Sequence, residues 1–161
     1  ISLGHKKIAH IAGDTITQSA ALRLEGYKEA LIENKIKENP EYIIKTDYSR
    51  GEARQAAEKL LLLKDAPTAI FIASDSMALE VIAVIMEKGK KVPEDISVVG
   101  FDDNPSSLYG AVAITTVRQP LIKMAEEGVK ELNSLINGKK ELAMIKLPAE
   151  LVIRDSCKAI K

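Results

Sequence analysis

Hydrophobic residues fall along this chain in two alternating patterns. Short runs that are hydrophobic at nearly every position are typical of strands buried on both faces of a sheet. Longer segments with a hydrophobic residue every three or four positions are typical of amphipathic helices. The predicted strands are residues 7–12, 42–47, 69–73 and 96–101, and the predicted helices are residues 18–36, 50–64 and 76–89. This alternation predicts an α/β fold: a doubly wound parallel sheet flanked by helices.

The pattern changes after residue 103. Residues 104–113 are rich in Ser, Gly and Pro and predict a loop, and residues 114–117 predict a brief strand. A helix follows, with Pro120 in its first turn and Gly138 just past its end. Its hydrophobic stripe consists of Leu121, Met124, Ala125, Gly128, Val129, Leu132 and Leu135 or Ile136. A last strand is predicted at residues 150–153.

Composition narrows the class of protein. The 161 residues are enough for one domain with a hydrophobic core, and Lys+Arg and Asp+Glu both total 23, so the net charge is zero. A neutral domain is a poor candidate for binding nucleic acid through its overall field. Cys157 is the single cysteine, which excludes an internal disulfide and is compatible with a reducing cytosol. No hydrophobic run approaches the roughly 18 residues of a membrane span.

Polar residues follow the predicted strands at the edge where ligands bind in an open α/β sheet. The strand at residues 96–101 is followed directly by Asp102 and Asp103, whose carboxylates can accept hydrogen bonds from hydroxyl or amine groups. The alternatives are a turn role for these aspartates, a helix cap for Ser74 and a plain surface position for Arg23. The candidates for a small-molecule pocket are Thr17, Ser19, Arg23, Tyr48, Ser74, Asp75 and Asp102.

Catalytic signatures are missing from the sequence. The glycine motifs that bind dinucleotides or phosphates do not occur, and neither does G-x-S-x-G. His5 and His10 have no partner at a metal-ligand spacing. The basic residues at 88–91 lie at a predicted helix C-terminus, where cations are favoured and solvated. We therefore expect no enzyme activity and no cofactor.

Six segments resemble one known family. They are residues 5–13 (HKKIAHIAG), 22–31 (LRLEGYKEAL), 67–79 (PTAIFIASDSMAL), 92–103 (VPEDISVVGFDD), 115–120 (TTVRQP) and 147–156 (LPAELVIRDS). In this order they are similar to the LacI/GalR family of bacterial transcriptional regulators, whose effector-binding half resembles periplasmic sugar-binding proteins. Among these segments, residues 92–103 match the family pattern almost letter for letter.

The resemblance implies the C-terminal part of a longer cytoplasmic repressor. Residues 1–113 and 147–161 would form the C-terminal effector-binding subdomain, and residues 114–146 a strand-helix crossover to a missing N-terminal sensor subdomain. Operator DNA would be bound only by a missing helix-turn-helix. The effector would be a sugar or a related metabolite, with no membrane as a partner. Arg23, Tyr48, Ser74, Asp75 and Asp102 fall on effector-contact positions, with Thr17 and Ser19 on the same side; Ser74 replaces the Asn that is common in the family.

The helix predicted after Ser74 is hydrophobic nearly all round. One face must pack on the sheet, so the other needs cover. We expect the other face to form a homodimer interface, which the resemblance also implies. The interface residues would be Leu79, Ile82, Ala83 and Met86. The alternative is a helix covered by its own chain.

One expectation concerns the helix that follows Pro120. Without the first subdomain, the stripe of Leu121, Met124 and Leu132 would either pack back on its own domain or pair with a second copy, and the sequence favours the second copy.

The alternative function is a fragment of a periplasmic sugar-binding protein of a transport system, for which a signal peptide in the full gene would decide. An enzyme of doubly wound fold is disfavoured by the absence of catalytic motifs.

Overall fold

A computed structural model describes residues 1–141 and 143–160 and contains one mostly parallel sheet. The strands are β1 (Ile8–Ala12), β2 (Ile43–Lys45), β3 (Ala69–Ile72), β4 (Ser97–Asp102), β5 (Thr115–Arg118) and β6 (Glu150–Val152). They lie in the order β2-β1-β3-β4-β5-β6, with β1 to β5 parallel and β6 antiparallel to β5. The doubly wound α/β fold expected from the sequence is confirmed, with one antiparallel edge strand.

Four helices accompany the sheet: α1 (Gln18–Glu33), α2 (Arg50–Leu62), α3 (Asp75–Glu87) and α4 (Leu121–Ile136). Two short 3₁₀ helices lie in the connections: η1 (Pro40–Tyr42) before β2 and η2 (Pro105–Leu108) between β4 and β5. The second strand was expected to begin at Tyr42, but Asn39 accepts a hydrogen bond from the Glu41 amide and caps η1 there. The strand is therefore shorter than its hydrophobic pattern indicates.

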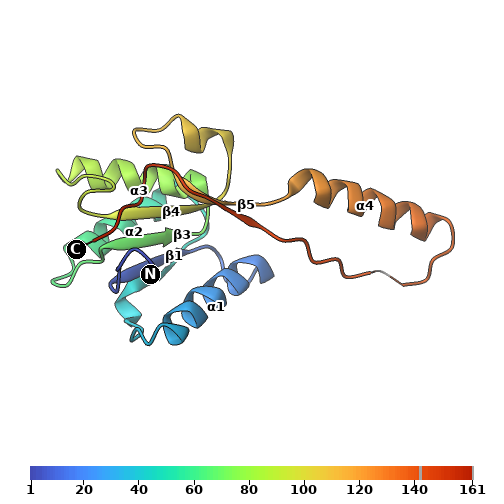
Figure 1. Ribbon diagram of the computed structural model, residues 1–161, viewed down its shortest axis with the longest axis horizontal. Coiled ribbons are helices and arrows are strands. Elements are labelled where there is room, and N and C mark those ends of the chain that lie inside the picture. Colours follow the sequence, from blue (N-terminus) through green and yellow to red (C-terminus); the bar gives the residue numbers. More distant parts are fainter. Residues whose placement is uncertain (142, 161) are drawn as a thin grey trace.

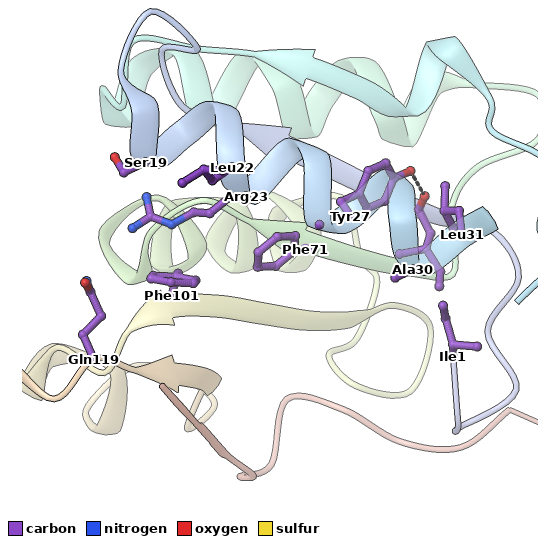
Figure 2. A pocket seen from close by; sticks show the side chains of 12 residues that line it. Ile1, Ser19, Leu22, Arg23, Tyr27, Ala30, Leu31, Phe71, Phe101 and Gln119 are labelled. Carbon is purple, nitrogen blue, oxygen red and sulfur yellow. Dashed lines mark hydrogen bonds between the residues drawn. The ribbon is translucent and has the colours of Figure 1, made fainter. Parts of the chain in front are cut away.

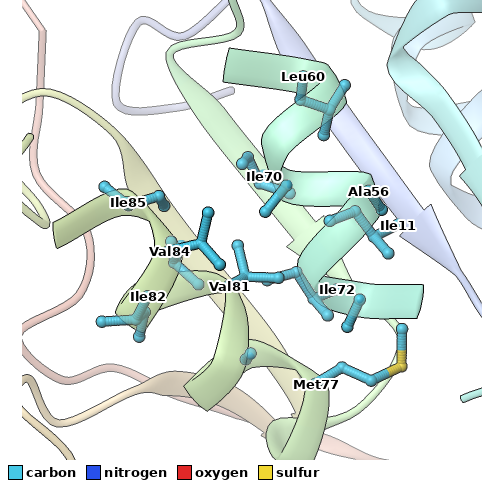
Figure 3. Packing of buried hydrophobic residues seen from close by; sticks show 14 of the residues in the cluster. Ile11, Ala56, Leu60, Ile70, Ile72, Met77, Val81, Ile82, Val84 and Ile85 are labelled. Atoms are coloured by element: carbon cyan, nitrogen blue, oxygen red, sulfur yellow. The ribbon is translucent and has the colours of Figure 1, made fainter. Parts of the chain in front are cut away.

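Helices α2 and α3 pack together on one face of the sheet, and α1 covers the other face (Figure 1). Figure 3 shows the core between the sheet and the α2–α3 layer, where Ile11, Ile70 and Ile72 meet Leu60, Met77 and Val81. Because side chains alternate along a strand, His10 points to the face opposite Ile11. There it stacks on Tyr27 of α1, with ring centroids 5.2 Å apart.

The core also contains Ile82, which was expected at a dimer interface. Its side chain is 2% exposed and is covered by its own chain (Figure 3). Of the other three, Met86 is exposed, whereas Leu79 and Ala83 are half-buried. An interface on this helix would therefore depend on Leu79, Ala83 and Met86.

Helix α4 extends away from the sheet (Figure 1), and none of its residues is buried. Leu121 is 59% exposed, Met124 46% and Leu132 58%. The stripe therefore does not pack back on its own domain, which was one of the two expected arrangements. Pairing with a second copy stays a prediction.

The buried His10 gives the fold a pH dependence. Its Nδ1–H donates to the Phe71 carbonyl oxygen at 3.0 Å, and its ring lies between Tyr27 and Phe71. Burial lowers the pKa of His10 from 6.5 to about 4, since the site disfavours the charged ring. The unfolded chain therefore takes up the proton first, and stability present above pH 6.5 is lost as the pH falls toward 4.

We expect the free energy of unfolding to fall by about 3 kcal/mol from this group between pH 7 and pH 4. Urea unfolding of wild type and His10→Phe at both pH values measures it. The variant keeps an aromatic ring between Tyr27 and Phe71, so it should lose about 3 kcal/mol less than wild type over this range. Equal losses in the two proteins would contradict the assignment.

Candidate functional site

Five side chains converge at the carboxyl ends of the strands: Arg23, Tyr48, Phe101, Asp102 and Gln119, here called the Arg23 cluster. They come from α1, the loop after β2, the end of β4 and the residue after β5. Figure 2 shows Arg23, Phe101 and Gln119 facing one another, with Ser19 beside them. Residues far apart in the chain thus meet at the edge where open α/β sheets bind ligands.

Arg23 is the centre of this cluster. Its Nη1 donates to the Tyr48 hydroxyl oxygen at 3.1 Å, and its Nη2 lies 4.0 Å from Asp102 Oδ1. The guanidinium carbon lies 3.9 Å from the centroid of the Phe101 ring, a cation–π contact. Arg23 is 15% exposed, and its Nε has no partner among the described residues. A planar fork of donors placed over a ring is suited to binding neighbouring oxygens of a ligand.

Asp102 supplies the opposite charge and remains reachable. Its Oδ1 accepts a hydrogen bond from Gln119 Nε2 at 2.7 Å, and its side chain is 38% exposed. Burial raises the pKa of Asp102 above its ordinary value, although the charge of Arg23 and the Gln119 hydrogen bond oppose this. Its φ of 112° is a conformation that non-glycine residues rarely adopt, and such backbone strain clusters at functional sites.

Tyr48 is placed by close contact with Gly13. A Cβ at Gly13 would lie 1.9 Å from Cζ of the Tyr48 ring, so only glycine allows the ring to rest on the end of β1. Tyr48 itself has a φ of 68°. The ring and the Phe101 ring provide two aromatic surfaces next to the Arg23–Asp102 pair, which suits a ligand with both hydroxyl groups and a hydrophobic face.

A groove of about 630 Å³ extends from the Arg23 cluster along α1 (Figure 2). Its end near Arg23 is polar, and the rest is hydrophobic. The lining residues are Ile1, Ile8, Ser19, Leu22, Arg23, Gly26, Tyr27, Ala30, Leu31, Phe71, Phe101 and Gln119. Ser19, expected at the pocket, is exposed and lines this groove.

Asp75 lies beneath the site and is fully buried. It accepts hydrogen bonds from Thr116 Oγ1 at 2.6 Å and from the Asn104 amide at 2.8 Å. Burial raises the pKa of Asp75, and these two hydrogen bonds oppose the shift. A Cβ at Gly100 would lie 2.2 Å from Asp75 Oδ1, so this glycine makes room for the carboxylate. Both oxygens of Asp75 are used within the protein, which indicates a structural role.

Two further candidates cap helices. The Ser74 hydroxyl accepts from the Met77 amide at 3.4 Å and caps α3. The Thr17 hydroxyl accepts from the Ala20 amide at 3.4 Å and caps α1, while donating to the Asp14 carbonyl. The structure therefore brings Arg23, Tyr48 and Asp102 together, whereas Ser74, Asp75 and Thr17 form hydrogen bonds within the protein around the site.

Metal and membrane sites find no support in the described residues. Within residues 1–141 and 143–160, no group of three His, Cys, Asp or Glu side chains is arranged to hold a metal ion. In the same part of the chain, no helix has the length and hydrophobicity needed to cross a bilayer.

Residues 1–157 match the family described as periplasmic binding protein-like domain. The chain belongs to this family. It is 35% identical to the HTH-type transcriptional repressor PurR of Haemophilus influenzae (strain PittEE) over 164 residues, which covers 99% of this chain and 49% of PurR. It is 48% identical to the regulator MalR of Clostridium butyricum over 135 residues, covering 84% of this chain and 40% of MalR. The chain thus spans about half the length of these curated relatives.

Solved structures of LacI-type members have the same fold. A putative transcriptional regulator LacI from Bacillus cereus subsp. cytotoxis matches with a TM-score of 0.94 at 33% identity, over 99% of this chain and 57% of its own. The regulator CelR in complex with cellobiose gives 0.92 at 32% identity, over 96% and 48%. The lac repressor dimer bound to operator gives 0.89 at 34% identity, over 98% and 55%. The resemblance to LacI/GalR regulators is confirmed, and none of these relatives is named as an enzyme.

Two members of the Arg23 cluster, Phe101 and Gln119, were not predicted from the sequence. Phe101 precedes Asp102 and looked like one more hydrophobic residue of a buried strand, and Gln119 follows a strand too short to reveal where it ends. The signal that points to both is their place in two of the segments that resemble the family, residues 92–103 and 115–120.

Proposed function

We propose that this chain is the effector-sensing part of a cytoplasmic LacI-type transcriptional regulator. The observation that carries the proposal is that Arg23 and Asp102, which a ligand can reach from solvent, lie together next to the Tyr48 and Phe101 rings. A sugar has hydroxyl groups around the edge of its ring and C–H groups on its faces. A site that binds it therefore needs hydrogen-bond donors, acceptors and aromatic ring faces in one place. The effector is accordingly a sugar or a related ring-shaped metabolite.

The relatives favour regulation of transcription over transport. The curated relatives described above are regulators, and one structural neighbour holds cellobiose. Operator DNA would be bound by a helix-turn-helix outside this chain, in keeping with its net charge of zero.

The crossover fits a second sensor subdomain. The chain leaves the sheet after β5 and returns to it at β6, and α4 between these strands has an exposed hydrophobic stripe. We assign residues 1–113 and 147–161 to the C-terminal subdomain. Because β5 pairs with β4 and β6 in the same sheet, only α4 of the crossover would belong to an N-terminal subdomain. That subdomain would cover α4 and close the Arg23 cluster from the other side, so this chain alone should bind its effector weakly.

The direct experiment is a melting assay on the full-length protein with glucose, maltose, cellobiose, glucuronate, hypoxanthine and guanine. A ligand that binds only the folded state raises the melting temperature, by mass action. We expect one sugar or sugar-like compound to give a shift that saturates with concentration. No shift with any sugar, together with a shift for a nucleobase, would contradict the sugar class.

We also propose a homodimer through α3, with Leu79, Ala83 and Met86 at the interface. A glutamate at Ala83 would place a charge in the hydrophobic contact without touching the buried core. We expect Ala83→Glu to sediment as a monomer at concentrations at which wild type is a dimer. Lys90→Glu, at an exposed position beyond the end of α3, is the control and should remain dimeric. A dimer that persists in Ala83→Glu would count against this helix.

A further inference from the structure

One carboxylate, Asp103, joins the effector site to both strands of the crossover. Asp103 Oδ2 accepts from Arg118 Nε at 2.6 Å, and Asp103 Oδ1 forms an ion pair with Arg154. Arg118 is the last residue of β5, through which the chain leaves the sheet, and Arg154 follows β6, through which it returns. A single side chain therefore holds the outgoing and the returning strands.

The ion pair between Asp103 and Arg154 is partly shielded from water. The side chains of Asp103 and Arg154 are 13% and 12% exposed. Arg154 Nη1 also donates to Ser107 Oγ at 2.8 Å and to the Ile114 carbonyl at 2.9 Å, so its position is fixed. Burial alone would raise the pKa of Asp103, but hydrogen bonds and charges from Arg118 and Arg154 outweigh it and hold the pKa below its ordinary value. Asp103 is thus charged and paired at neutral pH.

Asp103 is the direct neighbour of the effector carboxylate. Asp102 pairs in register with Arg118, and the Asp102 side chain contacts Gln119 while the Asp103 side chain contacts Arg118. Both aspartates have positive φ values, 112° and 57°. Such backbone conformations are rare for non-glycine residues and persist only where the surrounding structure holds them. Thr116 Oγ1 supports the turn by accepting from the Asp103 amide at 3.4 Å.

We propose that Asp103, Arg118 and Arg154 are positioning residues that transmit effector binding at Asp102 to the crossover strands. The inference rests on the proposed function, because it needs an effector at Asp102. When the effector fixes Asp102, the adjacent Asp103 fixes both arginines, and β5 and β6 open less often. Without Asp103 the effector still contacts Arg23 and Asp102, but the strands no longer respond.

The test is hydrogen exchange on the full-length protein, with and without the compound that gives the largest melting shift in the panel above. In wild type the compound should slow exchange in peptides around Arg23 and Tyr48 and in β5 and β6. In Asp103→Asn and Arg118→Gln, affinity by calorimetry should stay within about threefold of wild type. Protection of β5 and β6 should fall at least about fivefold in both variants, with protection around Arg23 retained.

Arg118→Gln changes a half-exposed side chain, so it keeps the proposal testable if Asp103→Asn does not fold. Glu150→Gln is the matched control, because Glu150 also pairs with Arg118, at 3.5 Å, but is 69% exposed and does not contact Asp103. It should behave as wild type.

Four outcomes would overturn the inference. Wild-type protection of β5 and β6 in both variants would show that Asp103 transmits nothing. Affinity lost a hundredfold or more would show that Asp103 acts on the pocket itself. A wild type protected around Arg23 but not at β5 and β6 would overturn the coupling and leave the proposed function intact, whereas a wild type that responds to no compound overturns both.

Discussion

Replacing Asp102 by alanine is expected to weaken effector binding by about 2–5 kcal/mol, roughly 30-fold to several thousandfold. The cost has two parts. The effector loses a charged acceptor, and Arg23, which is 15% exposed, keeps its charge without the carboxylate 4.0 Å away. Arg23→Ala should cost a similar amount, because it removes the donor fork and exposes the Phe101 ring. Calorimetric titration of the full-length protein with the compound selected by the melting assay measures both.

Asp65→Ala is the control for this pair. Asp65 is an aspartate paired with Lys7, but both side chains are exposed and lie before β1 and β3, at the opposite edge of the sheet. A surface pair of this kind contributes little, so affinity should not change. Wild-type affinity in both Arg23→Ala and Asp102→Ala would remove the Arg23 cluster as the effector site.

The second large effect is on stability. Asp75→Ala should lower the free energy of unfolding by about 3 kcal/mol or more, because hydrogen bonds to a charged group are worth roughly 1.5–3 kcal/mol each and two are lost. The Thr116 hydroxyl and the Asn104 amide would lose their acceptor beneath the site. Urea unfolding of wild type and variant measures the difference.

Asp75→Asn separates this structural role from a direct effector contact. The amide fills the same space and keeps one acceptor oxygen, so the loss of stability should be smaller than in Asp75→Ala. If Asp75 contacted the effector, as its position in the sequence suggests, Asp75→Asn would weaken binding with little change in unfolding. That result would contradict the role assigned to it here.

Local sequence patterns predict most of the sheet because strands and helices differ in period. The four inner strands and three helices lie close to their expected residues for this reason. The direction of β6 could not be predicted, since three residues carry no signal of which neighbour they pair with. The boundary of β2 was missed because the Asn39 cap of η1 outweighs the hydrophobic pattern at Tyr42.

The site is harder to predict than the fold because it depends on where each polar atom finds its partner. Position after a strand places Arg23, Asp102 and Asp75 at one edge of the sheet. Only the three-dimensional structure shows that Asp75 is used by Thr116 and Asn104, whereas Asp102 remains reachable. Ile82 illustrates the same limit: on a helix hydrophobic all round, the sequence does not say which residues the sheet covers.

A crystal structure of the full-length protein with the selected compound tests the central claim most directly. We predict that the compound lies at the carboxyl ends of the strands, with polar atoms within hydrogen-bond distance of Arg23 and Asp102 and a ring face against Tyr48 or Phe101. The account would be contradicted by a compound bound elsewhere while Arg23 and Asp102 contact only protein side chains, namely each other, Tyr48 and Gln119.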